Sequence, residues 1–387
     1  MINVPSCCLV SHTLKIGVGP ADANRLLAGE LMQRGYRVSL CGLNDSSVTR
    51  VCAEEMSIHG TRVPVLNIPR AIQWPDRRDA LRRFLEQQQP AHVIFRFIPY
   101  SLNPKGIVWA AAGSLPQAFR GYSVICLVDE IWLGAGPSTI KHRLVGALQR
   151  YSIMRMLQGV KPTRVYTNNR FNTGALRRKG VQAETLRLFG NIPLVPADDG
   201  TWLYHEFAKV GIPITPANRG QWLVLGNFGL FHSDWKPDLF FTALRDLARK
   251  HGRKICIAGI GSLGVYEGHW RSVVRTWSGD FTFLHLGRRR DVEVSLFLQA
   301  VDFGITTTPY HLVGKSGTCM AMLDHGLPII VPRISEEDDP TEFPPGFLLR
   351  CGDQVGPEIF AERKHRPPNP QLPRTVDELV SAMSGAR

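Results

Sequence analysis

The sequence predicts an α/β protein made of two doubly wound parallel sheets. Its 387 residues leave room for two or three domains. Strand-like and helix-like segments alternate through both halves, which is typical of βαβ units with right-handed crossovers. Between the halves, residues 193–220 hold seven Pro and Gly residues, a composition typical of a connection. We therefore expect an N-terminal domain over 1–195, a linker over 196–220, a C-terminal domain over 221–365, and an extended segment with a final helix, 366–387, that returns to the N-terminal domain.

The first half opens with a βαβ unit. Residues 6–12 are short, apolar and β-branched, like a buried parallel strand. A loop with Gly17 and Gly19 follows, and then a helix over 21–35 with leucines at helical spacing and Gly35 as its stop. Further strands are predicted at 36–42, 61–68, 92–98, 123–129 and 164–169, with helices at 76–88, 139–158 and 172–179.

The second half repeats this alternation. Residues 221–229 form a strand with a glycine loop, and the next helix has Pro237 near its start and Gly252 at its end. Asp291 is the expected N-cap of a later helix, and Thr375 with Glu378 is expected to form the capping box of the last one. The remaining predicted strands are 254–261, 281–287, 302–309 and 327–333, and the remaining helices are 236–252, 269–277, 291–300, 315–326 and 375–385.

Composition limits the partners. Lys and Arg number 46 and Asp and Glu 33, so the net charge of +13 favours anionic partners. The basic residues are spread along the chain rather than gathered in an arm, so we expect no nucleic-acid role. Peripheral contact with an anionic membrane stays open, although no clear amphipathic basic helix requires it.

The eight cysteines form no C-x-x-C pair, and several lie in apolar strand-like runs. This pattern favours buried free thiols over zinc ligands, and we expect no metal site. The start of the chain has no signal-peptide pattern, and no apolar run approaches the roughly 18 residues of a membrane span. We expect a cytoplasmic protein, with the inner face of the membrane as a second option.

The strongest local motif lies at residues 314–318. Small residues at a helix start leave backbone N–H groups available, and the helix dipole favours an anion there. Lys315 adds a charge, and Ser316 and Thr318 flank Gly317 with hydroxyl groups. The spacing is not that of a Walker loop. The motif predicts a diphosphate site; the alternative is an ordinary Ser/Thr cap beside a solvated lysine.

A second glycine motif follows the strand at 254–261. Gly259, Gly261 and Gly264 match the dinucleotide fingerprint, but this strand is the second of its domain and no acidic residue ends a clear next strand. A loop that lets a nucleotide approach the backbone is favoured, with a plain tight turn as the alternative. Gly287 and Arg288 follow the next strand, where Arg288 is either a ligand contact or a surface charge.

Other candidates lie at the ends of strands, where open α/β sheets bind ligands. Asp129 and Glu130 could accept a proton or bind sugar hydroxyls, or could serve as a cap and a surface charge. Tyr100 and the loop with Gly17 and Gly19 are further candidates, with structural turns as the alternative. Lys236, in the second half, could reach a phosphate or lie in solvent.

Several segments together resemble the bacterial glycosyltransferase group 1 family over roughly residues 7–335. They are PYSLNPKG, VDEIWLG, VYTNNRF, LFGNIP and, above all, DFGITTTPYHLVGKSGTCMAMLDHGLPIIVPR. The resemblance implies the GT-B fold, in which two Rossmann-like domains face an interdomain cleft. It also implies hexosyl-type transfer from a nucleotide-diphosphate sugar to a hydroxyl acceptor, with retention and without a tightly bound metal or cofactor. The acceptor would be a glycan, a lipid-linked molecule or a small molecule.

The resemblance also implies residue roles. Lys315 would stabilise the leaving diphosphate, and Asp129 and Glu130 would face the sugar and the acceptor. The donor diphosphate would be bound by Lys236, Ser316, Gly317 and Thr318, and Gly287 and Arg288 would lie beside the base. From the loop positions of the residues themselves, we further expect Gly259 and Gly261 on the nucleotide side and Gly17, Gly19 and Tyr100 on the acceptor side.

Two departures from the family pattern leave other functions open. The family often has two glutamates eight positions apart where this chain has Val313 and Ala321, and often has histidine where it has Asp129. A nucleotide-sugar 2-epimerase of the same fold, and a binding protein that keeps the fold without catalysis, are therefore retained as alternatives.

Overall fold

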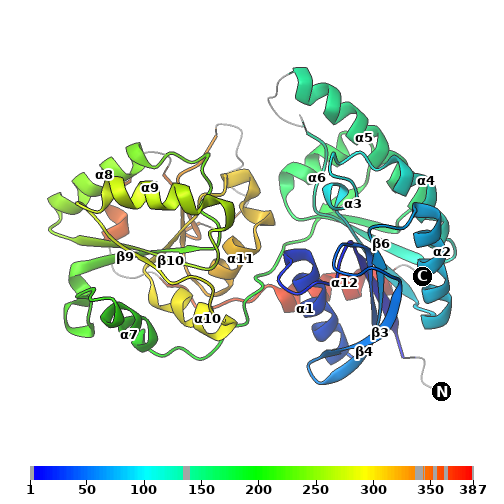
Figure 1. The fold of residues 1–387 in the computed structure, drawn as a ribbon, viewed down its shortest axis with the longest axis horizontal. Coiled ribbons are helices and arrows are strands. Elements are labelled where there is room, and N and C mark those ends of the chain that lie inside the picture. Colours follow the sequence, from blue (N-terminus) through cyan, green and yellow to red (C-terminus); the bar gives the residue numbers. More distant parts are fainter. Residues whose placement is uncertain are drawn as a thin grey trace. The chain divides into compact units, whose positions relative to one another are not determined.

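The structure, a computed structural model, describes residues 4–133, 140–335, 343, 345–351, 355–360 and 365–385. The chain forms two compact units, each with its own sheet (Figure 1). Unit 1 comprises Met1–Arg187 and Leu372–Arg387, and unit 2 comprises Leu188–Gln371. Residues 196–220, predicted as a linker, lie within unit 2, where helix α7 (Thr201–Lys209) buries Leu203 and Phe207.

Unit 1 is built on an eight-stranded sheet in the order β3-β4-β2-β1-β5-β6-β7-β8. All described pairings are parallel except the antiparallel hairpin of β3 and β4. β3 and the short β8 were not predicted. The strands are β1 (Ser6–Ser11), β2 (Arg37–Asp45), β3 (Cys52–Ile58), β4 (Thr61–Pro69), β5 (His92–Phe97), β6 (Ser123–Val128), β7 (Arg164–Thr167) and β8 (Ala183–Thr185).

Helices cover the sheet of unit 1, and the last of them comes from the C-terminal end of the chain. The helices are α1 (Gly19–Gln33), α2 (Trp74–Gln88), α3 (Pro99–Leu102), α4 (Trp109–Ala118), α5 (Ile140–Val160), α6 (Arg170–Arg177) and α12 (Leu372–Ser384). Residue 139, where the sequence predicted the start of α5, lies outside the described residues.

Helix α12 lies against α1, where Asp377 pairs with Arg34, and buries Val376 and Leu379. The capping box predicted at Thr375 is wrong: the helix begins three residues earlier, and the Thr375 hydroxyl donates to the carbonyl of Arg187 at 2.9 Å.

Unit 2 has a six-stranded parallel sheet in the order β11-β10-β9-β12-β13-β14. Its strands are β9 (Trp222–Phe228), β10 (Lys254–Ile260), β11 (Thr282–His285), β12 (Phe303–Ile305), β13 (Ile329–Val331) and β14 (Leu348–Arg350). Besides α7, its helices are α8 (Asp238–Lys250), α9 (Glu267–Trp277), α10 (Asp291–Ala300) and α11 (Gly317–Asp324), with 3-10 turns η1 (Pro216–Gln221), η2 (Gly264–Tyr266), η3 (Tyr310–Lys315) and η4 (Pro357–Phe360).

The N-cap of α10 differs from the prediction. Arg290 occupies the cap position, and Asp291 is the first helical residue. The backbone N–H of Arg290 donates to the Glu293 carboxylate at 3.1 Å, so Glu293, and not Asp291, supplies the side-chain hydrogen bond at this helix start.

Both sheets have the same kind of reversal in strand order. In unit 1 the chain builds outward from β1 through β2 and then returns to place β5 on the other side of β1. In unit 2 it builds outward from β9 through β10 and returns to place β12 on the other side of β9. A doubly wound sheet binds ligands at this switch point, outside the carboxyl ends of the strands. Each unit therefore has one favoured edge for a site.

Within the described part of the chain, no helix is long and apolar enough to cross a membrane. All eight cysteines are free thiols, and six of them are buried, which confirms the prediction for those six. Cys52 and Cys351 are half-buried.

Candidate functional site

The carboxyl edge of the unit 2 sheet is lined by three glycine turns. Gly229, Gly261 and Gly287 follow β9, β10 and β11 with φ of 88°, 100° and 67°, in the left-handed region that favours glycine. The N–H of Gly229 donates to Ile260 O, and that of Gly261 donates to Gly287 O, both at 2.8 Å. A Cβ at Gly261 would lie 3.1 Å from the amide nitrogen of Gly229. The three turns thus present backbone rather than side chains at this edge.

Helix α11 begins beside the first of these turns. Ser316 is its N-cap, and the Ser316 hydroxyl accepts a hydrogen bond from the Cys319 N–H at 3.4 Å and lies 3.1 Å from the Thr318 hydroxyl. A Cβ at Gly229 would lie 3.1 Å from the Thr318 methyl carbon, so the loop after β9 contacts the first turn of α11. The N–H groups of Gly317 and Thr318 have no acceptor within an α-helix, because they belong to its first turn.

Both predicted lysines belong to this unit. Lys315 ends η3 directly before the N-cap and is partly exposed. Lys236 is exposed in the loop between β9 and α8, and its ammonium donates to Ser233 O at 3.0 Å. The loop with Lys236 and the loop with Lys315 leave β9 and β12, the two strands at the switch point.

The predicted nucleotide-side residues separate into two groups. Gly261 and Gly287 share the turn contact described above. Gly259 lies within β10, where a Cβ would come within 2.9 Å of the His285 ring, so packing against His285 already accounts for this glycine. Arg288 is exposed and forms no ion pair within the described part of the chain, whereas Arg289 pairs with Glu206 at 3.0 Å.

A pocket of about 380 Å³ also lies at this edge of unit 2. Loops after β9, β12 and β13 line it. The Arg333 guanidinium in its wall donates to Thr307 O at 2.9 Å and pairs with Asp234 at 2.7 Å, which ties the loops together. The lining residues are Asp234, Trp235, Pro309, His311, Pro332, Arg333, Ile334 and Ser335.

The positions at which the group 1 family often has glutamates are apolar and closed in this chain. Val313 and Ala321 are fully buried. A Cβ at Gly190 would lie 2.5 Å from the Ala321 Cα, so backbone packs directly against this part of α11. A carboxylate at either position would lose its hydration without a matching partner, which costs several kcal/mol. The local structure therefore fits the residues that the chain has.

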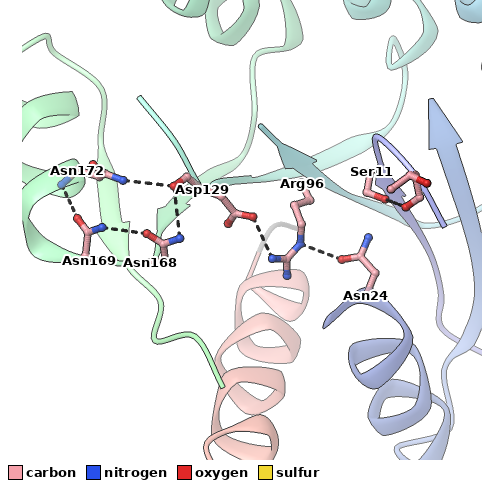
Figure 2. Close-up of polar contacts among 8 residues, drawn as sticks. Ser11, Asn24, Arg96, Asp129, Asn168, Asn169 and Asn172 are labelled. Atoms are coloured by element: carbon pink, nitrogen blue, oxygen red, sulfur yellow. Dashed lines mark hydrogen bonds and ion pairs between the residues drawn. The ribbon is translucent and has the colours of Figure 1, made fainter. Parts of the chain in front are cut away.

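At the carboxyl edge of unit 1, Asp129 is held by an ion pair with a buried arginine. The Arg96 guanidinium lies 3.0 Å from the Asp129 carboxylate, and Arg96 is only 5% exposed (Figure 2). Arg96 also donates to the Asn24 side chain of α1 at 2.9 Å. The charge of Asp129 is thus neutralised by a fixed cation, and one carboxylate oxygen is oriented toward Arg96.

Asparagines after β7 hold the backbone of the same residue. The side-chain amides of Asn168 and Asn172 donate to the carbonyl of Asp129 at 3.4 and 3.5 Å (Figure 2). Asn169 accepts from the Asn172 N–H at 2.7 Å as the N-cap of α6. The asparagines that follow β7 therefore clamp the end of β6, a role that the sequence analysis did not assign.

Gln149 of α5 is a second clamp that sequence reasoning missed. Its amide donates to the Tyr100 hydroxyl at 2.9 Å and to Lys105 O at 2.7 Å, and its carbonyl accepts from the Leu133 N–H at 2.8 Å. Gly106 has φ of 65°, and a Cβ there would lie 3.1 Å from the Tyr100 ring. The Tyr100 side chain is therefore fixed between a glycine turn and a buried amide.

Burial and neighbouring carboxylates shift the pKa values of two titratable side chains at this edge of unit 1. Burial, with a smaller contribution from the Glu130 carboxylate, raises the pKa of Tyr100, and the Gln149 hydrogen bond opposes the rise. His12 follows β1 at the switch point; burial lowers its pKa, while the charges of Asp45 and Asp129 oppose this. The edge thus brings Asp129, Glu130 and Tyr100 to the ends of neighbouring strands, with His12 beside them.

Gly17 and Gly19 lie further along the same side of unit 1. Gly17 has φ of 82°, and its N–H donates to the Asp22 carboxylate at 3.1 Å, while Gly19 begins α1. Asp22 also pairs with Arg25, which donates to Leu14 O at 3.0 Å. A Cβ at either glycine would meet open space, so the positive φ of Gly17 is the structural requirement here.

Among the described residues, no group of three or more His, Cys, Asp and Glu side chains is arranged to hold a metal ion. A scan of protein-family models finds no match to the chain, and neither does a search of curated protein sequences.

Solved structures resemble the chain over nearly its whole length. The catalytic domain of starch synthase IV from Arabidopsis thaliana, bound to ADP and acarbose, has a TM-score of 0.59 at 13% identity and covers 99% of both chains. Anabaena HepE in complex with UDP and glucose has a TM-score of 0.55 at 11% identity, over 98% of this chain and 100% of that one. The UDP-GlcNAc 2-epimerase of Neisseria meningitidis bound to UDP-GlcNAc has a TM-score of 0.53 at 9% identity, over 98% and 99%. At such low identity the likeness concerns the fold: the chain has two Rossmann-like, doubly wound parallel-sheet domains of the GT-B class, as predicted.

Proposed function

We propose that the protein is a glycosyltransferase that moves a sugar from a nucleotide-diphosphate sugar to a hydroxyl acceptor. The observation that carries the proposal is the junction of the Gly229 turn with the first turn of α11. Backbone amides at a helix start, next to Lys315, form a fixed positive region suited to a diphosphate. The neighbours of similar fold that are complexed with UDP or ADP support the same ligand class.

In this proposal unit 2 binds the donor. The amides and hydroxyls of residues 316–318 hold the diphosphate, and Lys315 and Lys236 neutralise the charge that develops on it as the bond to the sugar breaks. Preorganised charge of this kind is usually the largest catalytic contribution. Gly261 and Gly287 let the nucleotide approach the backbone, and Arg288, which forms no ion pair within the described residues, lies beside it.

Unit 1 binds the acceptor in this proposal. Because the Asp129 carboxylate is tied to Arg96, we assign it a positioning role, and we assign contact with the acceptor hydroxyl to Glu130 and Tyr100. For a transfer with retention, the acceptor attacks on the face that the diphosphate leaves, and a diphosphate oxygen takes its proton. The loop of Gly17 and Gly19 borders the acceptor side.

The first test is a thermal-shift screen with nucleoside diphosphates and nucleotide sugars, because a bound ligand stabilises the folded state by mass action. The best ligand is then used in transfer assays with pooled acceptors, with release of the nucleoside diphosphate as the signal. Lys315→Ala is expected to lower the transfer rate about 100-fold. Lys250→Ala, an exposed lysine of α8, is the matched control. An unchanged rate in Lys315→Ala would remove this residue from the mechanism.

A nucleotide-sugar 2-epimerase is the second candidate, because epimerases are among the proteins of similar fold. It would convert the nucleotide sugar without any acceptor. Incubation of the donor alone, followed by separation of the C2 epimers, distinguishes the two activities. Donor binding without epimer or transfer product would instead favour the binding protein that Val313 and Ala321 left open.

A further inference from the structure

The outward face of α5 carries a row of exposed apolar side chains. Leu144, Leu148 and Tyr151 follow one another at spacings of four and three residues, so they lie on one face of the helix. They are 66%, 52% and 60% exposed. Trp109 of α4 is 39% exposed and packs its ring against Tyr151, with centroids 4.9 Å apart. We call these four side chains the outer α5 surface.

The helix that carries this surface is firmly held on its other side. Ser152, Ile153 and Met156 are fully buried in unit 1, and Gln149 forms the clamp described above. The exposed row is therefore a fixed feature of a packed helix, and Figure 1 shows α5 at the edge of its unit. Contiguous exposed apolar groups on a folded protein typically mark a binding surface.

The charge on the two helices that carry this surface has one sign. Between Glu130 and Glu184 the sequence holds ten Lys and Arg residues and no Asp or Glu. Arg143 and Arg155 are exposed on α5 itself, and the neighbouring α4 has no acidic residue. The segment therefore contributes a large part of the net charge of +13, and neither helix has a carboxylate that could neutralise it.

We propose that the outer α5 surface docks the protein onto an anionic membrane leaflet. The leucines and the two aromatic rings would enter the headgroup region, where Trp and Tyr side chains are favoured, and the arginines would contact lipid phosphates. A nucleic acid would use the same arginines but would leave the leucines in water, so the combination favours lipid. In this arrangement α5 lies on the membrane and does not cross it.

The test uses the full-length protein with vesicles of pure phosphatidylcholine and vesicles that contain about 30% phosphatidylglycerol. Co-sedimentation is expected with the anionic vesicles alone and is expected to weaken in high salt. The double variant Leu144→Ser/Leu148→Ser is expected to weaken this binding about tenfold or more, because apolar groups that enter the bilayer are lost. Arg143→Gln/Arg155→Gln is expected to have an effect of similar size through the lost charges.

Matched controls come from unit 2. Leu239→Ser removes a leucine that is likewise 66% exposed, and Lys250→Gln/Arg275→Gln removes two exposed charges; neither is expected to change vesicle binding. The proposal is overturned if the wild type stays in the supernatant with anionic vesicles, if the α5 variants bind as well as the controls, or if generic duplex DNA binds in place of vesicles. Because the test needs no turnover, its outcome is independent of the proposed transfer activity.

Discussion

Paired charge determines which carboxylates at the unit 1 edge are available for chemistry. Asp129 is tied through its carboxylate to Arg96 and through its carbonyl to two asparagines, so both ends of the residue are fixed. Burying a guanidinium is tolerable only while its partner is present. The pair therefore stabilises the end of β6 and holds the neighbouring Glu130 in place.

Asp129→Asn is expected to destabilise unit 1 by about 3 kcal/mol, because the Arg96 charge would stay buried without its partner. Faster amide exchange in β5 and β6 would report this loss. The double variant Arg96→Met/Asp129→Leu removes both charges and is expected to recover much of it. If the single variant exchanges like the wild type, the ion pair does not stabilise this edge.

The buried carboxyl of Asp324, at the end of α11, makes the stability of unit 2 depend on pH. It accepts from the Gly190 N–H at 2.8 Å, and burial raises its pKa from 3.8 to about 6. The folded state then binds the proton more tightly than the unfolded state. This carboxyl therefore favours folding below about pH 4, and its contribution is lost as the pH rises to about 6.

Asp324→Asn keeps an acceptor for Gly190 and removes the titration. Relative to the variant, the wild type is expected to lose about 2 kcal/mol of unfolding free energy between pH 4 and pH 7. Urea unfolding of both proteins across this range measures the difference. Asp246→Asn, at an exposed position, serves as the control. If the unfolding free energies of the wild type and the Asp324 variant change in parallel over this pH range, the raised pKa of Asp324 is contradicted.

Sequence reasoning found the strand-end acids but not the residues that hold them. Arg96 was detectable as a lone charge within the apolar strand HVIFRF, where a buried partner is required. Gln149 gave no such signal, because a glutamine in a helix is ordinary in solvent and in the core. Its role depends on α3 and two loops that meet only in the folded unit.

At the scale of elements, the start of α11 combines two functions in Ser316. Its hydroxyl caps the helix, and its position places it at the proposed diphosphate site. The two functions separate by substitution, because aspartate is as good an N-cap as serine but repels an anion.

Ser316→Asp is therefore expected to keep the stability of unit 2 within about 1 kcal/mol of the wild type and to abolish the thermal shift by nucleoside diphosphates. Ser316→Ala is expected to lose about 1 kcal/mol of stability and to retain part of the shift. Thermal melts with and without ligand measure both effects. A full ligand shift in Ser316→Asp would place the anion elsewhere.

The elements that the sequence predicted best have strong periodicity or clear end signals, such as β1, α8 and the strands that lead to the glycine turns. The missed elements lacked such signals. α4 is rich in Ala and contains Pro116, which normally argues against a helix interior. β3 has mostly exposed side chains, so it shows no buried apolar run. The row on α5 was missed because its exposed leucines look like core positions until the packed face is known.

At the scale of the whole molecule, the burial of thiols gives a direct check of both cores. Burial raises the pKa of Cys8 and Cys256 to about 12, so these groups are neither accessible nor ionised at neutral pH. A native protein is expected to expose only Cys52 and Cys351 to a thiol reagent, with all eight reacting after denaturation. The number of thiols that react rapidly with the reagent is measured by absorbance. A third rapidly reacting thiol would mean that one core is more accessible to the reagent than described.

The division into two units also shows where prediction from sequence ends. Alternation of strands and helices predicted two sheets, and the final helix was expected to return to the N-terminal domain. The role of residues 196–220 was not foreseeable from their prolines, because α7 owes its place to Leu203 and Phe207, which complete the core of unit 2. Proline and glycine residues indicate loops, but they do not indicate to which unit a loop belongs.

The C-terminal helix α12 gives the fold an order of completion. Unit 2 lies entirely within an insertion between the two segments of unit 1, so a ribosome releases all of unit 2 before it releases the residues that cover α1. A nascent chain that stops after residue 371 would contain all of unit 2, but in unit 1 the apolar side of α1 that α12 covers would be exposed. Helix α12 is thus synthesised after the whole of unit 2, although it completes the unit that precedes unit 2 in the chain.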